Sequence, residues 1–172
     1  DKLTELFNID YFIRYIKSFD RQYRDSSIDV VACDVNQFHS VNERYGRQFG
    51  DLVLRSIGHT MRRLARKTGG LGCRQGGDTF LLYCPHQEHY DQLLQKFLAD
   101  VFVEKETAHK VSLRFGVFEH AERERDIEKR LEFAIKAADS AQEYPDKLYC
   151  LVLVSFVIFN APDFASVGTQ LG

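Results

Sequence analysis

The centre of the sequence reads Leu71-Gly72-Cys73-Arg74-Gln75-Gly76-Gly77-Asp78-Thr79-Phe80-Leu81-Leu82-Tyr83-Cys84, two partly apolar runs on either side of a glycine-rich turn. Gly76 and Gly77 can take the positive φ that a tight turn requires. The flanking runs are typical of strands. The pattern predicts a β-hairpin with strands over residues 71–75 and 79–84.

Helical and strand patterns alternate around this hairpin. Apolar residues at helical spacing predict four helices, and apolar runs or alternation predict two further strands. The predicted helices cover residues 9–24, 49–67, 93–101 and 127–141, the last closed by Pro145, and the strands cover residues 28–35 and 111–117. This order contains a β-α-β-β-α-β pattern. We therefore expect an α+β fold with a ferredoxin-like core, a mostly antiparallel central sheet of about five strands, and flanking helices.

Length and charge narrow the class of protein. A chain of 172 residues that is 44% hydrophobic is long enough for one domain with a core. A net charge of -2 gives no general attraction to nucleic acid. We expect the domain to cover residues 1–150. Residues 151–172 match no motif, so a final strand, a linker and a docking segment all remain open.

Cysteines and hydropathy indicate the compartment. Cys33, Cys73, Cys84 and Cys150 stand singly in apolar runs, which favours buried reduced thiols over a zinc site. The chain opens with a charged residue, unlike a signal peptide, and its longest apolar stretch is too short to span a bilayer. We expect a cytoplasmic segment without membrane contact, either alone or as the cytoplasmic part of a membrane-anchored protein.

Two acidic residues lie where a predicted strand meets a turn. Asp34 ends the strand of residues 28–35, and Asp78 lies in the hairpin. In a ferredoxin-like sheet these strands can be central neighbours, which would bring the carboxylates within about 4–8 Å of each other, near one hydrated cation. Such an oxygen-rich pair suits magnesium bound to a nucleotide phosphate. Alternatively, both aspartates could simply satisfy backbone groups in their turns.

Five ordered stretches resemble motifs of the GGDEF domain family. The family patterns are D-x-L-T-x-L-x-N, D-x-D-x-F-K-x-I-N, G-H-x-x-G-D, R-x-G-G-D-E-F and a late strand. The matching stretches are Asp1-Lys2-Leu3-Thr4-Glu5-Leu6-Phe7-Asn8, Asp34-Val35-Asn36-Gln37-Phe38-His39-Ser40-Val41-Asn42, Tyr45-Gly46 with Gly50-Asp51, Arg74-Gln75-Gly76-Gly77-Asp78-Thr79-Phe80, and Val111-Ser112-Leu113-Arg114-Phe115-Gly116-Val117.

The resemblance implies a nucleotidyl cyclase-like fold in a bacterial cyclic di-GMP signalling protein. In this family two facing domains join two GTP molecules into cyclic di-GMP. The implied partners are GTP and either a second GGDEF domain or an adjacent signalling or phosphodiesterase domain. The resemblance implies that Asp34, the Val35 carbonyl and Asp78 bind Mg²⁺ or Mn²⁺, and that Asp78 also activates the attacking hydroxyl. Gly76 and Gly77 would let the backbone approach the phosphates, and His39 would lie beside them. Asn42 and Asp51 would contact guanine.

Departures from the family pattern affect the acidic site most. Thr79 replaces the motif glutamate, and a neutral hydroxyl cannot serve as a charged ligand. Asn36 replaces the second aspartate of its motif, His39 and Asp146 replace expected lysines, and Arg47 replaces a histidine. The inhibitory R-x-x-D motif is absent at residues 67–70.

These departures predict a module with impaired or absent diguanylate cyclase activity that acts through GTP binding or dimerisation. Two alternatives stay open, namely an active cyclase that tolerates threonine and an interaction domain without a nucleotide site.

Overall fold

The fold is an α+β sheet structure, seen in a computed structural model that describes residues 1–101, 111–143, 148–154 and 157–160, with backbone only from residue 142 onward. Its elements follow one another along the chain as α1 (Ile9–Gln22), β1 (Ile28–Val35), α2 (Phe38–Tyr45), α3 (Arg47–Thr68), β2 (Leu71–Gly76), β3 (Thr79–Pro85), α4 (Tyr90–Val101), β4 (Leu113–Glu119), α6 (Ile127–Asp139), β5 (Gln142–Glu143), β6 (Leu148–Val154) and β7 (Val157–Asn160).

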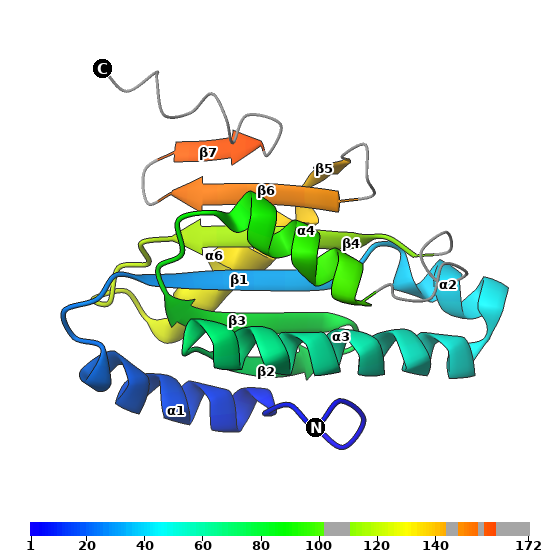
Figure 1. Ribbon diagram of the computed structural model, residues 1–172, viewed down its shortest axis with the longest axis horizontal. Helices are drawn as coiled ribbons and strands as arrows, with labels where there is room; N and C mark the ends of the chain where they lie inside the picture. The colour runs from blue at the N-terminus through cyan, green and yellow to red at the C-terminus, as the bar shows by residue number, and fades with distance from the viewer. Residues whose placement is uncertain (102–110, 144–147, 155–156, 161–172) are drawn as a thin grey trace.

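The sheet has the order β2-β3-β1-β4-β6-β5, with β7 paired to β6 (Figure 1). β1 lies in the centre and pairs antiparallel with β3 and β4, whereas β6 runs parallel to β4. The predicted α+β class and the mostly antiparallel sheet are confirmed. The described residues form seven strands rather than about five, because β5, β6 and β7 extend the sheet beyond β4.

The chain after residue 150 continues the sheet rather than leaving it at once. β6 spans Leu148–Val154 and therefore crosses the expected domain boundary at residue 150. Of the alternatives for the tail, a final strand is found as far as Asn160. Residues 161–172 lie outside the described residues.

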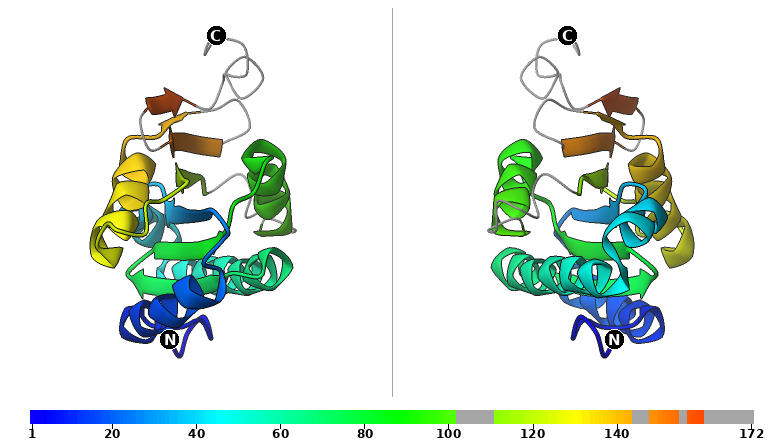
Figure 2. Two further views of the ribbon diagram at one scale, coloured as in Figure 1. Left: turned by 90° about the vertical axis from the view of Figure 1, so that its left-hand side faces the viewer. Right: turned by 90° about the vertical axis from the view of Figure 1, so that its right-hand side faces the viewer.

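Helices cover both faces of the sheet, as Figure 2 shows. All eight residues of β1 are buried, and its alternating side chains point into two separate cores. Val31, Cys33 and Val35 pack with residues of α3 and α4, whereas Val30 and Ala32 pack with residues of α1 and α6. A doubly covered strand explains the continuous apolar run in the sequence.

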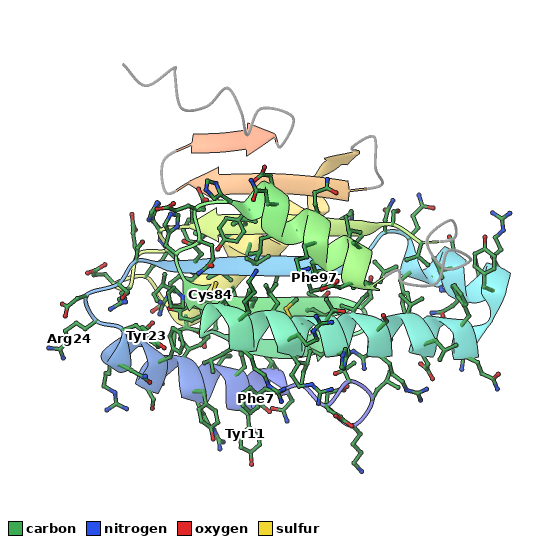
Figure 3. The ribbon with its side chains drawn as sticks, in the orientation of Figure 1. Phe7, Tyr11, Tyr23, Arg24, Cys84 and Phe97 are labelled. Carbon is green, nitrogen blue, oxygen red and sulfur yellow. The ribbon has the colours of Figure 1, made fainter. Side chains whose placement is uncertain are left out.

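Aromatic and glycine contacts fix the two helical layers on the sheet. On one face, Phe97 of α4, labelled in Figure 3, points toward the sheet. Its ring meets that of Phe115 of β4 edge to face at 5.6 Å between ring centroids. On the other face, α6 approaches β4 so closely that a Cβ at Gly116 would lie 2.0 Å from the Ala134 carbonyl oxygen. Only glycine permits that approach.

Helix ends follow local capping chemistry. The Asn8 side chain accepts a hydrogen bond from the Tyr11 N–H at 3.0 Å and so caps the start of α1. α3 ends at Thr68, followed by Gly69 in the left-handed conformation with φ 68°. The sequence patterns predicted no helix at α2, which meets α3 at Gly46 with φ 87°.

Several predicted boundaries are wrong by two or three residues; α4, for example, begins at Tyr90 rather than at residue 93. α6 ends at Asp139, so Ala141 lies beyond the helix and Pro145, outside the described residues, does not close it. The helix ends early because the chain enters β5 at Gln142. β4 covers residues 113–119 rather than 111–117, and the alternating apolar residues Leu113, Phe115 and Val117 are buried.

No helix among the described residues is long and apolar enough to cross a membrane.

Candidate functional site

The candidate site lies at the end of β1 where the chain enters α2, beside the turn of the β2–β3 hairpin. Gly77 has φ 53°, a left-handed conformation that suits glycine. A Cβ at Gly76 or Gly77 would meet no atom within 4 Å. The turn is therefore open to approach from outside.

Strand pairing brings the two predicted carboxylates to one place. β1 pairs with β3 so that Cys33 lies opposite Phe80, which puts Asp34 next to the hairpin turn. The Asp78 carboxylate accepts a hydrogen bond from the Val35 N–H at 3.1 Å and interacts electrostatically with Asp34. The predicted convergence of Asp34, Val35 and Asp78 is therefore found, while the separation of 4–8 Å stays a prediction.

Arg114 is a site residue that the sequence reasoning missed. It lies directly opposite Asp34 in the β1–β4 pairing. Its Nε and Nη2 donate to the two oxygens of Asp34 at 2.8 and 2.9 Å, and Nη2 also lies 3.5 Å from Asp139. This two-pronged geometry is the strong form of an arginine–carboxylate pair. A charged residue within an alternating apolar strand was the signal that could have revealed it.

Burial and neighbouring charge act in opposite directions on Asp34. Its side chain is only 10% exposed. Burial raises the pKa of the Asp34 carboxyl, and the nearby Asp78 and Asp139 add to this, against the lowering effect of Arg114. The Arg114 guanidinium thus interacts electrostatically with three carboxylates, those of Asp34, Asp78 and Asp139.

Arg74 links the hairpin turn to the N-terminal residue Asp1. It donates to the Gly77 carbonyl oxygen at 2.9 Å and contacts the Asp1 carboxylate at 3.3 Å. Burial lowers the pKa of Arg74, while Asp51 and Asp78 act to raise it. Arg74 therefore lies within the electrostatic reach of both the predicted guanine contact Asp51 and the acidic turn.

The two predicted guanine contacts lie together at the junction of α2 and α3. The Asn42 side chain covers Gly50 so closely that a Cβ there would lie 2.0 Å from Asn42 Oδ1. Asp51 follows Gly50 directly and is exposed. A hydrogen-bonding amide and a carboxylate thus occupy neighbouring positions, as a guanine edge would require.

His39 lies on α2 and its side chain is 88% exposed. Its Nε2 is 3.1 Å from the Glu43 carboxylate one turn along the helix. Beside it, the start of α2 borders a cavity of about 220 Å³ lined by Asn36, Gln37, Ser40, Val41, Arg44, Tyr45 and Ser112. Thr79 is half-buried opposite Gly76, and Asp146 lies outside the described residues.

Comparison with known proteins places these features in one family. Residues 1–146 match the family described as "Diguanylate cyclase, GGDEF domain". Diguanylate cyclase DgcS of Shewanella oneidensis is 29% identical over 119 residues, 68% of this chain and 38% of that protein. Diguanylate cyclase VdcA of Vibrio cholerae is 30% identical over 87 residues, 51% of this chain and 25% of that protein. The chain thus spans well under half the length of these relatives.

Solved structures show the same fold. Diguanylate cyclase SiaD of Pseudomonas aeruginosa, in complex with its activator SiaC, matches 88% of this chain and 60% of its own, with a TM-score of 0.67 at 24% identity. A diguanylate cyclase/phosphodiesterase from Caldicellulosiruptor saccharolyticus matches 92% and 95%, with a TM-score of 0.70 at 19% identity.

The mostly antiparallel sheet, with its glycine-rich acidic hairpin beside a second strand-end carboxylate, has the nucleotidyl cyclase-like fold. The chain belongs to the GGDEF family, the domain of diguanylate cyclases.

Proposed function

We propose that this chain is a catalytically degenerate GGDEF module that retains a site for GTP with a divalent cation and acts as a regulatory or dimerising domain of a cytoplasmic cyclic di-GMP signalling protein. The observation that carries the proposal is the pair of hydrogen bonds that the Arg114 guanidinium donates to both oxygens of Asp34. The guanidinium occupies one lone pair on each Asp34 oxygen and brings a positive charge to the position where a divalent ion would bind, so it weakens metal binding there.

The donor set still fits a hard cation in its chemistry. Asp34, Asp78 and the Val35 carbonyl would supply oxygen ligands, which Mg²⁺ prefers, and Mn²⁺ accepts the same set. A bound divalent ion would neutralise the charge of the nucleotide phosphates. The residues therefore suit the ion, but Arg114 competes for one of its carboxylates.

Thr79 weakens the site further. It occupies the hairpin position that follows Asp78, where the family motif has a glutamate. Phosphoryl transfer depends on positioned charge, and a threonine hydroxyl is neutral near pH 7. The loss of one such group commonly reduces the rate by a factor of about 100 to 1,000.

The guanine side of the proposed site is better preserved than the phosphate side. Asn42 and Asp51 keep amide and carboxylate groups that can read a guanine edge. His39 and Thr79 replace a cation and an anion on the phosphate side. Nucleotide binding can therefore outlast catalysis, with selectivity for GTP over ATP.

The decisive experiment measures cyclic di-GMP formation by the purified chain with GTP and Mg²⁺ or Mn²⁺. We expect turnover at least about 100-fold below that of an active GGDEF domain measured in parallel. The double variant Thr79→Glu with Arg114→Ser restores the acidic group and releases Asp34, so it should raise turnover above the wild type. Thr79→Gln with Arg114→Ser is the matched control, because glutamine has the size of glutamate without its charge.

Two outcomes would count against the proposal. Wild-type turnover near that of the active domain would establish an active cyclase. Calorimetry that detects no binding of GTP at millimolar concentration, with or without magnesium, would leave an interaction domain without a nucleotide site.

A further inference from the structure

A second cluster of ligand-type side chains lies at the opposite end of β1. Asp29 is near the start of this strand, whereas Asp34 is near its end. The five-residue separation corresponds to about 16 Å at the usual rise of a strand. The two clusters also face different helical layers, because residues an odd number of positions apart point to opposite faces of a sheet.

Antiparallel pairing gathers three strand ends at this place. β3 ends at Pro85 opposite Ile28, and β4 ends at Glu119 just past the pairing of Phe118 with Val30. His86 and His120 are the first residues after these two strands. Neighbouring backbone hydrogen bonds hold both connections, from His86 N to Ser27 O at 2.9 Å and from Ala121 N to Ile28 O at 2.7 Å.

Asp29, His86 and His120 each offer a ligand atom, and these atoms all lie within 4.8 Å of one another. The two imidazole rings are 4.2 Å apart between centroids. In a tetrahedral zinc site with bonds of about 2.0–2.1 Å, ligand atoms lie about 3.3 Å apart. His120 is exposed and the His86 side chain is 28% exposed, so small side-chain rotations would close the remaining gap.

The carboxylate of Asp29 is held as a fixed acceptor. It is fully buried and accepts hydrogen bonds from the Tyr90 hydroxyl at 2.6 Å, the Gln87 N–H at 3.0 Å and the His120 N–H at 2.9 Å. His86 Nδ1 lies 2.9 Å from Asp29 Oδ2. A metal ion would take the place of the proton shared by these two atoms, and their distance would open by only a few tenths of an ångström.

Surrounding groups support a cation at this position. Ser27 Oγ lies 2.6 Å from His120 Nδ1 and orients that ring, as hydrogen bonds at the ring nitrogens of metal-binding histidines commonly do. Glu119 interacts electrostatically with both Asp29 and His86, which adds a second carboxylate to the cluster. A divalent ion would relieve the repulsion between the two carboxylates.

We propose that Asp29, His86 and His120 form a binding site for a borderline divalent metal ion of the Zn²⁺ type, which clamps the ends of β1, β3 and β4 together. Two imidazoles and one carboxylate are the donor set that zinc accepts with a water as fourth ligand. The hard cations Mg²⁺ and Ca²⁺ prefer oxygen donors and would bind weakly here. The site is independent of the nucleotide site and of its activity.

The test uses the tag-free chain, stripped of metal with a chelator. Calorimetry with Zn²⁺ should show one site, the melting temperature should rise with zinc concentration, and Mg²⁺ at the same concentrations should have no such effect. Co²⁺ should give the visible absorption of a nitrogen- and oxygen-liganded ion.

The informative variant is His120→Asn, because His120 has φ 53° and asparagine tolerates this conformation while it removes the imidazole. Zinc affinity should fall at least tenfold, about 1.4 kcal/mol. His86→Asn should have a similar effect. His89→Asn is the matched control, since His89 is exposed and lies outside the cluster. No zinc-dependent stabilisation of the wild type, or equal affinity in His120→Asn and His89→Asn, would overturn the proposal.

Discussion

The two ends of β1 carry the same residue type in opposite circumstances. Asp29 is fully buried and is surrounded by backbone N–H groups, a tyrosine and a histidine, all anchored in the fold. Asp34 lies beside an exposed hairpin turn, and its two oxygens are held by one arginine side chain. A carboxylate tied to the backbone stabilises structure, whereas one tied to a movable side chain can exchange its partner. This difference suits Asp29 to a structural clamp and Asp34 to a ligand site.

The sharpest test of this comparison exchanges each aspartate for asparagine. Asp29→Asn replaces a carboxylate oxygen by an NH₂ group, which cannot accept the hydrogen bonds that backbone N–H groups and the Tyr90 hydroxyl donate to it. We expect it to lower the free energy of unfolding by about 2–4 kcal/mol. Asp34→Asn weakens the pair with Arg114, whose side chain is 25% exposed and can turn toward solvent, so the loss should be smaller, about 1.5 kcal/mol. Urea unfolding, with equal m-values, measures both. Equal losses would show that the two ends do not differ in structural role.

The hydroxyl of Tyr90 tests one of the contacts that hold Asp29. Burial raises the pKa of Tyr90, and the nearby Cys84 and Asp29 add to this, so the hydroxyl stays protonated and donates to the carboxylate. Tyr90→Phe should lower the free energy of unfolding by about 1.5 kcal/mol or more, since the lost hydrogen bond ends on a charged group. Tyr11→Phe is the matched control, because Tyr11 is 54% exposed and should change stability by less than about 0.5 kcal/mol. A similar small change in both variants would contradict the anchoring role.

Sequence patterns predicted the Asp34 end and missed the Asp29 end for a physical reason. The hairpin Arg74–Phe80 and the strand before Asp34 carry local signals, namely glycines that permit a turn and an apolar run that ends in an acid. Asp29, His86 and His120 have no such local signal, because 57 residues separate the first pair and 91 the outer pair. Only the register of β1 with β3 and β4 brings them together.

The difference between local sequence signals and contacts between distant strands also explains which other predictions were right and which were wrong. The β1 run and the β2–β3 hairpin depend on neighbours in the chain, and both were predicted. Arg114 was not, because its partner Asp34 lies on another strand. The end of α6 was misplaced, since pairing of β5 with β6, rather than the helical pattern itself, draws the chain away after Asp139.

Removal of Arg114 should change the Asp34 end of β1 without changing the Asp29 end, because Arg114 contacts only the former of these two aspartates. Arg114→Ala releases both Asp34 oxygens, so we expect the affinity for GTP with magnesium to rise several-fold relative to GTP without magnesium. Arg114→Lys keeps the positive charge but loses the two-pronged hydrogen bonding, so its affinity for GTP with magnesium should lie between those of the wild type and Arg114→Ala. Calorimetry with and without magnesium makes the comparison. Weaker binding in Arg114→Ala would indicate that the arginine serves the phosphates rather than Asp34.

The smallest expected effect concerns His39, where the family pattern has a lysine. Its exposed ring contacts only Glu43 among the interactions that the structure describes for it. His39→Lys adds one full positive charge near the start of α2, so we expect GTP with magnesium to bind about twofold to fivefold more tightly, as an exposed charge pair contributes about 0.5–1 kcal/mol. Guanosine, which has no phosphate, should bind unchanged, and the gain for GTP should shrink in high salt because screening weakens exposed charges.

Glu43 would compete for the new ammonium group, so His39→Lys with Glu43→Gln should show the larger gain. His89→Lys adds the same charge after β3, near the Asp29 end, and should leave GTP affinity unchanged. If His89→Lys strengthens binding as much as His39→Lys, the effect reflects net charge rather than a phosphate site at the Asp34 end.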